Sequence, residues 1–343
     1  MRRRVQDSDK HNLSRSVSAE EVESVMLSMK IGKTPLSDGF TIEFYKDTWP
    51  IIKNSVIDAV KDFFATSHMP RFFNSTTITL IPKVSCPQHM RDFRPISCFN
   101  TIYKCITTIL TNRLKVTLQN VGGKQQTTYV PSRHIADGIL LMQELVCGYH
   151  KSSGKPRCAL KVDIMKAYDT VRWEFLWDVM DVLGYPLVFV NWIKACVSSA
   201  WFSISINGSL QGHFQSSRGL RQGDPLSSYL FILVMDYFTE LLKKSIGNSG
   251  FVYHPMCKEI ELVNVNFADD LFILYAANEG SVKIINKVLK LFGNVSDLHP
   301  NLSKSTCYFA GVNSEEELRL SSMLGMYVST LPVRYLGIPL TTK

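Results

Sequence analysis

Phe267-Ala-Asp-Asp270 joins two apolar stretches, and its pair of aspartates governs how the rest of the chain is interpreted. The stretches on either side, 261–266 and 271–275, are rich in β-branched and aromatic residues, which indicates two strands joined by a tight hairpin. Two carboxylates at an apolar hairpin tip are unfavourable unless a cation or solvent neutralises them. Mg²⁺ suits them because it prefers hard oxygen ligands. A solvated Asp-Asp turn is the alternative, and it is the better one for an isolated pair.

A third carboxylate shifts this balance toward a metal site. Asp163 ends another apolar stretch, 158–162, which predicts a strand beside the hairpin. Three aspartates at the ends of adjacent strands form the arrangement in which two metal ions carry out phosphoryl transfer. We therefore predict that Asp163, Asp269 and Asp270 together bind metal.

Periodic patterns predict the remaining helices and strands. Apolar residues recur at helical spacing over 18–30, 52–64, 101–118, 135–146, 173–183, 226–242 and 281–292. Strand patterns cover 76–81, 158–163, 202–206 and 306–310. Asn207-Gly208 is typical of a hairpin turn after the third of these strands. From residue 156 onward strands and helices alternate, which predicts an α+β fold with a split βαβ sheet covered by helices on one face.

Basic residues have two possible roles in this chain. The predicted helix 101–118 carries Lys104, Arg113 and Lys115 on its polar side. Lys83 and Arg94 follow the predicted strand 76–81. They are either surface charges or cations that hold a triphosphate, since the guanidinium fork of arginine matches the geometry of phosphate.

Composition narrows the class of partner and the compartment. The net charge of +8 favours a polyanionic partner, nucleic acid ahead of a membrane surface. The eight cysteines show neither a C-x-x-C pair nor zinc spacing, which indicates a reducing intracellular compartment. The most apolar run, 229–235, is too short to span a bilayer, so we expect no membrane partner.

Seven motifs follow one another in order from near residue 18 to the end of the sequence. They are Lys33-Thr-Pro-Leu-Ser-Asp-Gly-Phe40, Ile81-Pro-Lys83, Asp92-Phe-Arg-Pro-Ile-Ser97, Lys161-Val-Asp-Ile-Met-Lys-Ala-Tyr-Asp169, Arg218-Gly-Leu-Arg-Gln-Gly-Asp-Pro-Leu-Ser227, Phe267-Ala-Asp-Asp270 and Arg334-Tyr-Leu-Gly-Ile-Pro339. Together they resemble the reverse transcriptase domain of plant LINE-type non-LTR retrotransposons. The ordered set is far more specific than any single motif.

The resemblance implies a right-handed polymerase fold, in which helical fingers precede a split βαβ, ferredoxin-like palm. It places a loose basic N-terminus at 1–17, fingers at 18–155, and a palm with the catalytic aspartates at 156–310. Residues 311–343 would then be the end of the palm, with the thumb absent. On this interpretation the chain is a fragment of a larger polyprotein.

The same resemblance implies an RNA-directed DNA polymerase with two Mg²⁺ ions. Its partners would be an RNA template, a DNA primer and deoxynucleoside triphosphates, and its location would be intracellular and nuclear. Asp163 and Asp269 match the metal-binding aspartates of the family, and Asp270 matches their acidic neighbour. Lys304 resembles the lysine that protonates the pyrophosphate leaving group.

Five further positions match residues that contact the substrates. Tyr168 matches the aromatic gate under the incoming sugar. Gln222 and Gly223 match the loop that packs against nucleotide and template. Lys83 and Arg94 match the fingers cations near the triphosphate.

Two other functions remain open at this point. Leu36-Ser37, Ser132, Ser228 and Asp297 stand where the family usually has Gly or Pro. Such replacements favour an inactive, nucleic-acid-binding remnant of a degenerate retroelement copy as the alternative function. An RNA-folding role like that of group II intron maturases is a third possibility, which the spelling of the motifs disfavours.

Overall fold

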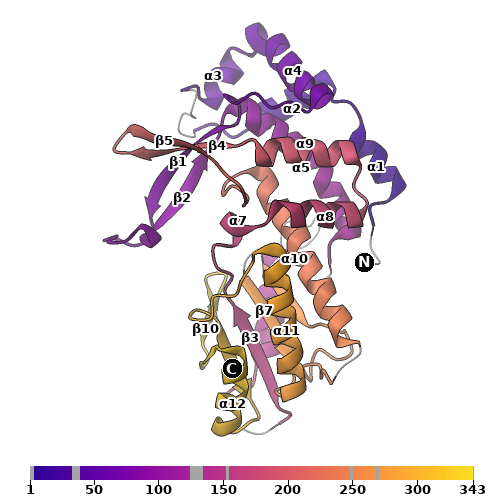
Figure 1. The fold of residues 1–343 in the computed structure, drawn as a ribbon, viewed down its shortest axis with the longest axis vertical. Coiled ribbons are helices and arrows are strands. Elements are labelled where there is room, and N and C mark those ends of the chain that lie inside the picture. The colour runs from indigo at the N-terminus through magenta and orange to yellow at the C-terminus, as the bar shows by residue number, and fades with distance from the viewer. Residues whose placement is uncertain are drawn as a thin grey trace. The chain divides into compact units, whose positions relative to one another are not determined.

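The chain divides into two compact units, each assembled from segments that lie far apart in the sequence. Figure 1 shows the fold, a computed structural model that describes residues 4–32, 39–123, 134–151, 154–247, 250–267 and 270–342. Unit 1 contains Gly122–Val179 and Phe231–Lys343. Unit 2 contains Arg2–Val121 and Met180–Leu230.

Unit 1 is built on a five-stranded sheet with the order β6–β7–β3–β8–β9. Its strands are β3 (Arg157–Val162), β6 (Asn264–Phe267), β7 (Asp270–Tyr275), β8 (Thr306–Ala310) and β9 (Tyr327–Val328). β3 pairs antiparallel with both β7 and β8, and β6 pairs antiparallel with β7. After β3, the next strand of this sheet along the chain is β6, but β7 lies between these two in the sheet. This order is that of a split βαβ arrangement. The predicted mixture of helix and sheet is confirmed.

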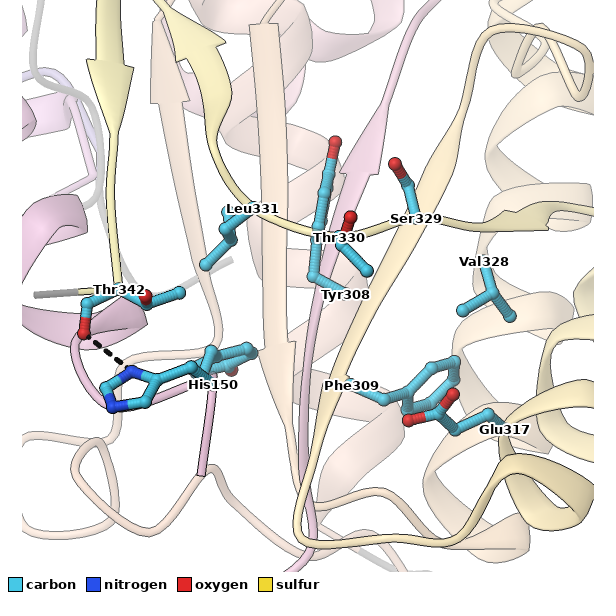
Figure 2. Close-up of a pocket in the computed structure, with 10 residues that line it drawn as sticks. His150, Tyr308, Phe309, Glu317, Val328, Ser329, Thr330, Leu331 and Thr342 are labelled. Carbon is cyan, nitrogen blue, oxygen red and sulfur yellow. Dashed lines mark hydrogen bonds between the residues drawn. The ribbon is translucent and has the colours of Figure 1, made fainter. Parts of the chain in front are cut away.

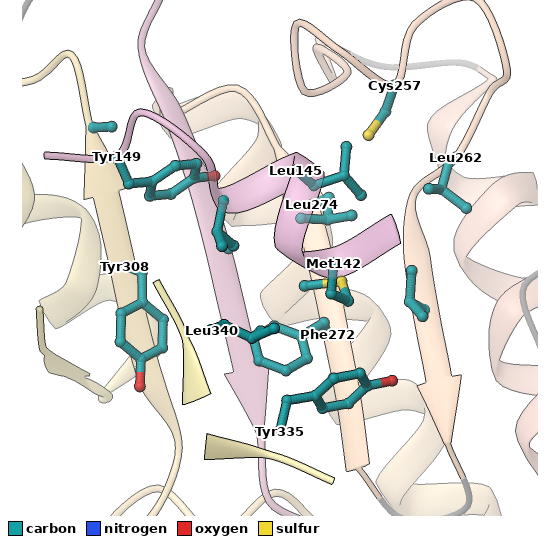
Figure 3. Close-up of a cluster of buried hydrophobic side chains, with 14 residues drawn as sticks. Met142, Leu145, Tyr149, Cys257, Leu262, Phe272, Leu274, Tyr308, Tyr335 and Leu340 are labelled. Carbon is teal, nitrogen blue, oxygen red and sulfur yellow. The ribbon is translucent and has the colours of Figure 1, made fainter. Parts of the chain in front are cut away.

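Both faces of this sheet are covered. Figure 3 shows α6 (Ile135–Val146) and the two-stranded sheet β10–β11 (Val333–Tyr335, Ile338–Leu340) packed on one face, in a buried cluster with Phe272 and Leu274. Helix α11 (Glu279–Ser296) lies along the other face (Figure 1). The expectation of helices on one face only is therefore wrong. The uninterrupted apolar run 271–275, buried at every position, is typical of a strand that is covered on both sides.

Helices complete unit 1 and link it to unit 2 along the chain. α7 (Ala167–Thr170) and α12 (Ser314–Leu324) belong to unit 1. α8 (Trp173–Leu183) begins in unit 1 and ends in unit 2, whereas α10 (Pro225–Ile246) begins in unit 2 and ends in unit 1. By length and composition α10 could cross a membrane, but 67% of its most apolar window is buried inside the protein, which accounts for its apolar character.

Unit 2 contains a four-stranded sheet with the order β2–β1–β4–β5. The strands are β1 (Ser75–Pro82), β2 (Phe93–Cys98), β4 (Trp201–Ile206) and β5 (Ser209–Gln215). The predicted turn between β4 and β5 is confirmed, because Asn207 and Gly208 both have positive φ, 50° and 80°, as a type I′ turn requires. The other elements are α1 (Asp7–Ser14), α2 (Ala19–Ser28), α3 (Ile42–Asp47), α4 (Trp49–Thr66), the short 3₁₀ helix η1 (Met90–Asp92), α5 (Thr101–Val121) and α9 (Leu187–Ser198).

The N-terminal segment differs from the loose tail that the sequence predicts. It forms α1, whose Leu13 is fully buried, and Arg113 of α5 is also buried, with 2% of its surface exposed. The Arg113 guanidinium pairs with Glu21 at 2.9 Å and donates to the carbonyl oxygen of Arg15 at 2.7 Å. Arg113 therefore fastens the segment before α2 onto α5, and its assignment to a polar helix face is wrong.

Candidate active site

Asp163 and Asp270 lie side by side at the end of two paired strands of unit 1. Asp163 directly follows β3, and Asp270 is the first residue of β7. The register pairs Val162 with Leu271, so the next position along brings the two aspartates together. Burial raises the pKa of Asp270, the Lys161 ammonium opposes this rise, and the charge of Asp163 adds to it. The Asp163 carboxylate is therefore close enough to act on Asp270.

The main chain of Asp163 is fixed by the segment that precedes β8. Its N–H donates to the buried hydroxyl of Ser305 at 3.1 Å, and its carbonyl accepts from the N–H of Asn301 at 2.7 Å. Two residues later, the N–H of Met165 donates to the carbonyl of His299 at 3.0 Å. Hydrogen bonds to both the N–H and the carbonyl of Asp163 therefore fix this end of the strand.

Lys161 is the cation of this site, and the sequence prediction missed it. Its Nζ lies 3.7 Å from Asp270 Oδ1 and donates to the carbonyl of Arg334 at 2.9 Å. The signal was available in the motif itself, because Lys161 stands two positions before Asp163. Side chains two apart along a strand point to the same face.

The two described carboxylates fit a divalent cation. They supply hard oxygen donors, and burial raises the pKa of Asp270 even beside Lys161, so a divalent cation would compensate a charge that burial disfavours. Asp269, the third predicted ligand, lies outside the described residues. Within the described ranges, no three His, Cys, Asp or Glu side chains gather around one point.

Lys304 and Tyr168 also belong to unit 1. Lys304 is exposed in the turn between Asn301 and β8, and in the described part of the chain it forms no ion pair. Tyr168 lies on α7 and stacks on Phe231 of α10, with ring centroids 4.8 Å apart and an interplanar angle of 19°. The preceding Lys166 has φ +45°, so the chain turns sharply between Asp163 and this ring.

The predicted triphosphate cations lie together in unit 2, at the end of the β1–β2 pair. Arg94 is exposed and stands opposite Ile81 in the register. Lys83 continues the ladder, because its N–H donates to the carbonyl of Asp92 at 2.7 Å. Its ammonium donates to the carbonyl of Arg91 at 3.0 Å. The structure therefore brings Lys83 and Arg94 to one end of this hairpin.

Gln222 and Gly223 form a turn in unit 2 that precedes α10. Gly223 has φ +94°, a conformation that only glycine adopts without strain. The turn lies between two buried charges, Arg221 and Asp224. These residues belong to a polar network that the sequence prediction missed.

The network joins the turn to β1, α5 and α9. Arg221 donates to the side chains of Asn74 at 2.6 Å and Thr76 at 3.0 Å. Tyr103, fully buried, donates to Asp224 at 2.6 Å and also contacts the Arg221 guanidinium. Burial raises the pKa of the Tyr103 hydroxyl, so it stays protonated as a donor. The turn is thus anchored by buried groups of β1, α5 and α9, the last through the carbonyl of Cys196.

A pocket of about 240 Å³ lies elsewhere in unit 1 (Figure 2). It is lined by Tyr149, His150, Tyr308, Phe309, Glu317, Val328, Ser329, Thr330, Leu331 and Thr342. Among the lining residues, His150 Nδ1 lies 3.1 Å from the carbonyl oxygen of Thr342. None of the residues predicted for the active site lines it.

Residues 81–340 match the family of reverse transcriptases, which are RNA-dependent DNA polymerases. The chain belongs to the reverse transcriptase family. The matched range includes both described carboxylates of the site and the cations Lys83 and Arg94.

Proteins of transposable elements are similar to this reverse transcriptase over most of its length. The Transposon TX1 uncharacterized 149 kDa protein of Xenopus laevis is 26% identical over 339 residues, which are 99% of this chain and 25% of that protein. The Pol polyprotein of the type-2 retrotransposable element R2DM of Drosophila melanogaster is 24% identical over 343 residues, 96% of this chain and 31% of that protein. An uncharacterized mitochondrial protein of Arabidopsis thaliana is 55% identical over 40 residues, 12% of this chain and 33% of that protein. The chain thus spans about a quarter to a third of the length of these relatives.

Proposed function

We propose that the chain is the RNA-directed DNA polymerase domain of a non-LTR retroelement of the plant LINE type. It would extend a DNA primer on an RNA template with deoxynucleoside triphosphates. The observation that carries this proposal is the adjacency of Asp163 and Asp270 in a chain whose residues 81–340 match reverse transcriptases. The local identity with a plant protein supports the plant assignment.

In this proposal the carboxylates of unit 1 bind metal. Asp163 and Asp270, with Asp269, would hold Mg²⁺. When bound, two such ions activate the attacking 3′-hydroxyl and stabilise the leaving oxygens. The protein's own part is positioning, because Ser305 and Asn301 fix the main chain of Asp163. Lys304, exposed beside this segment, would donate the proton to the pyrophosphate.

Four residues of unit 2 would contact nucleotide and template. Lys83 and Arg94 offer cations at one end of the β1–β2 pair, suited to the anionic triphosphate. Gln222 and Gly223 would pack against the nucleotide on the turn that Arg221 and Asp224 hold. Tyr168 of unit 1 would lie under the sugar and exclude a ribose 2′-hydroxyl.

The proposal also assigns residue ranges to the polymerase domains. Fingers would comprise 18–155 and the palm 156–310, and 311–343 would be the end of the palm. The compact units differ in two respects, since residues 122–155 group with the proposed palm and Met180–Leu230 groups with the residues before 122. A nuclear location would follow from the need to reach chromosomal DNA.

Primer extension on an RNA template, with and without Mg²⁺, tests the proposal. We expect the parent chain to extend only with Mg²⁺ and Asp163→Asn to abolish extension, because an amide oxygen is a poor Mg²⁺ ligand. Asp178→Asn is the matched control, since Asp178 is an exposed aspartate on α8 of the same unit. Extension by Asp163→Asn at the parent rate would contradict the assignment of the metal site.

A nucleic-acid-binding remnant is the second candidate. The net charge of +8 and the departures from the family pattern, such as Ser228, favour it. The same experiment separates the two functions. A parent chain that binds primer–template but never extends it would support the remnant.

A further inference from the structure

Lys161 is the second-to-last residue of β3, the central strand of the unit 1 sheet. It stands opposite Phe272 of β7 on one side and Thr306 of β8 on the other. Directly opposed residues of paired strands share a face, so the side chains of Lys161 and Phe272 lie on the same face as those of Asp163 and Asp270. This is also the face that the β10–β11 sheet covers.

Two contacts of the Lys161 ammonium differ in strength. The hydrogen bond to the carbonyl of Arg334 is short, at 2.9 Å, whereas Asp270 Oδ1 lies 3.7 Å away. Charge-assisted hydrogen bonds are typically about 2.7–2.9 Å long, so the tight contact is the one to the carbonyl. A main-chain carbonyl in a paired strand cannot swing aside, whereas the Asp270 side chain, 39% exposed, can rotate. The strand β10 therefore sets where the ammonium lies.

The strand that holds Lys161 is itself firmly placed. β10 and β11 are joined by Leu336 and Gly337, with φ of 53° and 84°, which is a type I′ turn. Tyr335 and Leu340, one on each strand, are fully buried (Figure 3). The Tyr335 ring meets Phe272 edge-on at 5.3 Å. The hairpin thus packs against Phe272, the residue of β7 that is paired with Lys161.

We propose that Lys161 is a positioning residue, which the β10–β11 hairpin fixes beside Asp270 so that this carboxylate is held ready for the metal ion. The proposal rests on the proposed function, because it takes Asp270 as a metal ligand. It makes the hairpin, which contains the motif Arg334-Tyr-Leu-Gly-Ile-Pro339, an outer support of the acidic site.

Direct Mn²⁺ binding, measured by the electron paramagnetic resonance of free Mn²⁺ without nucleotide, tests the role of Lys161. We expect Lys161→Met to bind Mn²⁺ about tenfold more weakly than the parent, in the range usual for groups that orient metal ligands. Lys258→Met is the matched control, because Lys258 is an exposed lysine of the same unit, and it should bind as the parent does.

The direction of the effect separates positioning from simple charge. Removal of a cation near a metal site strengthens metal binding if only Coulomb repulsion operates. Unchanged or tighter binding by Lys161→Met, in a protein that keeps the parent's circular dichroism spectrum, would therefore overturn the proposal.

Gly337→Val in the parent background tests the hairpin and keeps the proposal falsifiable if Lys161→Met fails to fold. Where Lys161→Met folds, the same substitution completes a double-mutant cycle. A Cβ at Gly337 meets no atom within 4 Å, so the substitution acts only through the positive φ of the turn. We expect Gly337→Val to weaken Mn²⁺ binding several-fold in the parent and to have no further effect in Lys161→Met. No effect in the parent, or the same loss in both backgrounds, would overturn the link between hairpin and site.

Failure of the proposed function gives a different result. A parent that binds no Mn²⁺, or binds it equally well after Asp163→Asn, contradicts the metal site itself and the inference with it. A parent whose binding depends on Asp163 but not on Lys161 contradicts the inference alone.

Discussion

At the scale of single residues, Asp270 illustrates how a partly buried carboxylate weakens the fold that contains it. Burial raises its pKa above 3.8. The Lys161 ammonium opposes this rise, and the charge of Asp163 adds to it. The folded state therefore binds this proton more tightly than the unfolded chain. Stability contributed by the protonated carboxyl is present below the unfolded pKa and is lost as pH rises through the folded value.

Asp270→Asn should accordingly stabilise the metal-free protein at neutral pH. We expect its Tm to exceed the parent's by about 1 °C at pH 7, a small effect because the side chain is partly exposed, and the difference to vanish below pH 3.8. Added Mg²⁺ should raise the Tm of the parent only, since the variant lacks the ligand. Differential scanning calorimetry across pH checks both; a variant less stable than the parent at pH 7 would contradict this account.

The sequence could not predict the side-chain contacts that join residues far apart in the chain. The strands around Asp163 and Asp270 could be predicted because alternation and apolar runs are local signals. Lys161 bonds to a main-chain carbonyl 173 positions away, and every residue offers such an acceptor. Arg221 likewise joins partners from three distant segments, around Asn74, Tyr103 and Cys196.

At the scale of elements, α5 shows why helical periodicity misled at one position. Its spacing puts Arg113 among polar residues, yet α1 and the segment before α2 cover that part of the helix. Periodicity gives the faces of a helix but not which segment packs on each. The buried guanidinium is compensated by Glu21 and by the carbonyls of Leu13 and Arg15.

Removal of Arg113 should therefore be costly. Arg113→Ala leaves Glu21 without its buried partner, and we expect a loss of about 3 kcal/mol in the free energy of unfolding. Lys115→Ala on the exposed side of the same helix should change it by less than about 0.5 kcal/mol. Urea titrations followed by tryptophan fluorescence compare the two variants, and similar losses in both would show that the burial of Arg113 is unimportant.

Asp297 shows how an element tolerates a departure from the family pattern. It caps α11 in the left-handed region, φ +61°, at a position where the resemblance to LINE-type reverse transcriptases predicts glycine. Aspartate adopts this conformation more easily than most residues. Its carboxylate also pairs with Arg172 at 2.8 Å, so the substitution brings a contact of its own.

At the scale of the whole molecule, the excess of positive charge has a measurable consequence. A net charge of +8 predicts binding to primer–template that weakens with salt, because each neutralised phosphate releases counterions. We expect affinity to fall roughly tenfold or more between about 50 and 200 mM salt. Fluorescence anisotropy of a labelled primer–template measures this, and a flat salt profile would count against a nucleic-acid surface.

The strand β5 has a practical consequence for anyone who handles this protein. Every residue of it is exposed, it lies at the edge of the unit 2 sheet, and it carries the apolar side chains of Leu210 and Phe214. An open edge of this kind can pair with the same edge of another copy, and natural proteins often guard such edges with lysine or proline. Concentrated samples should therefore become turbid or form assemblies whose size grows with time. Leu210→Lys would then yield a better-behaved preparation for crystals or cryo-microscopy grids.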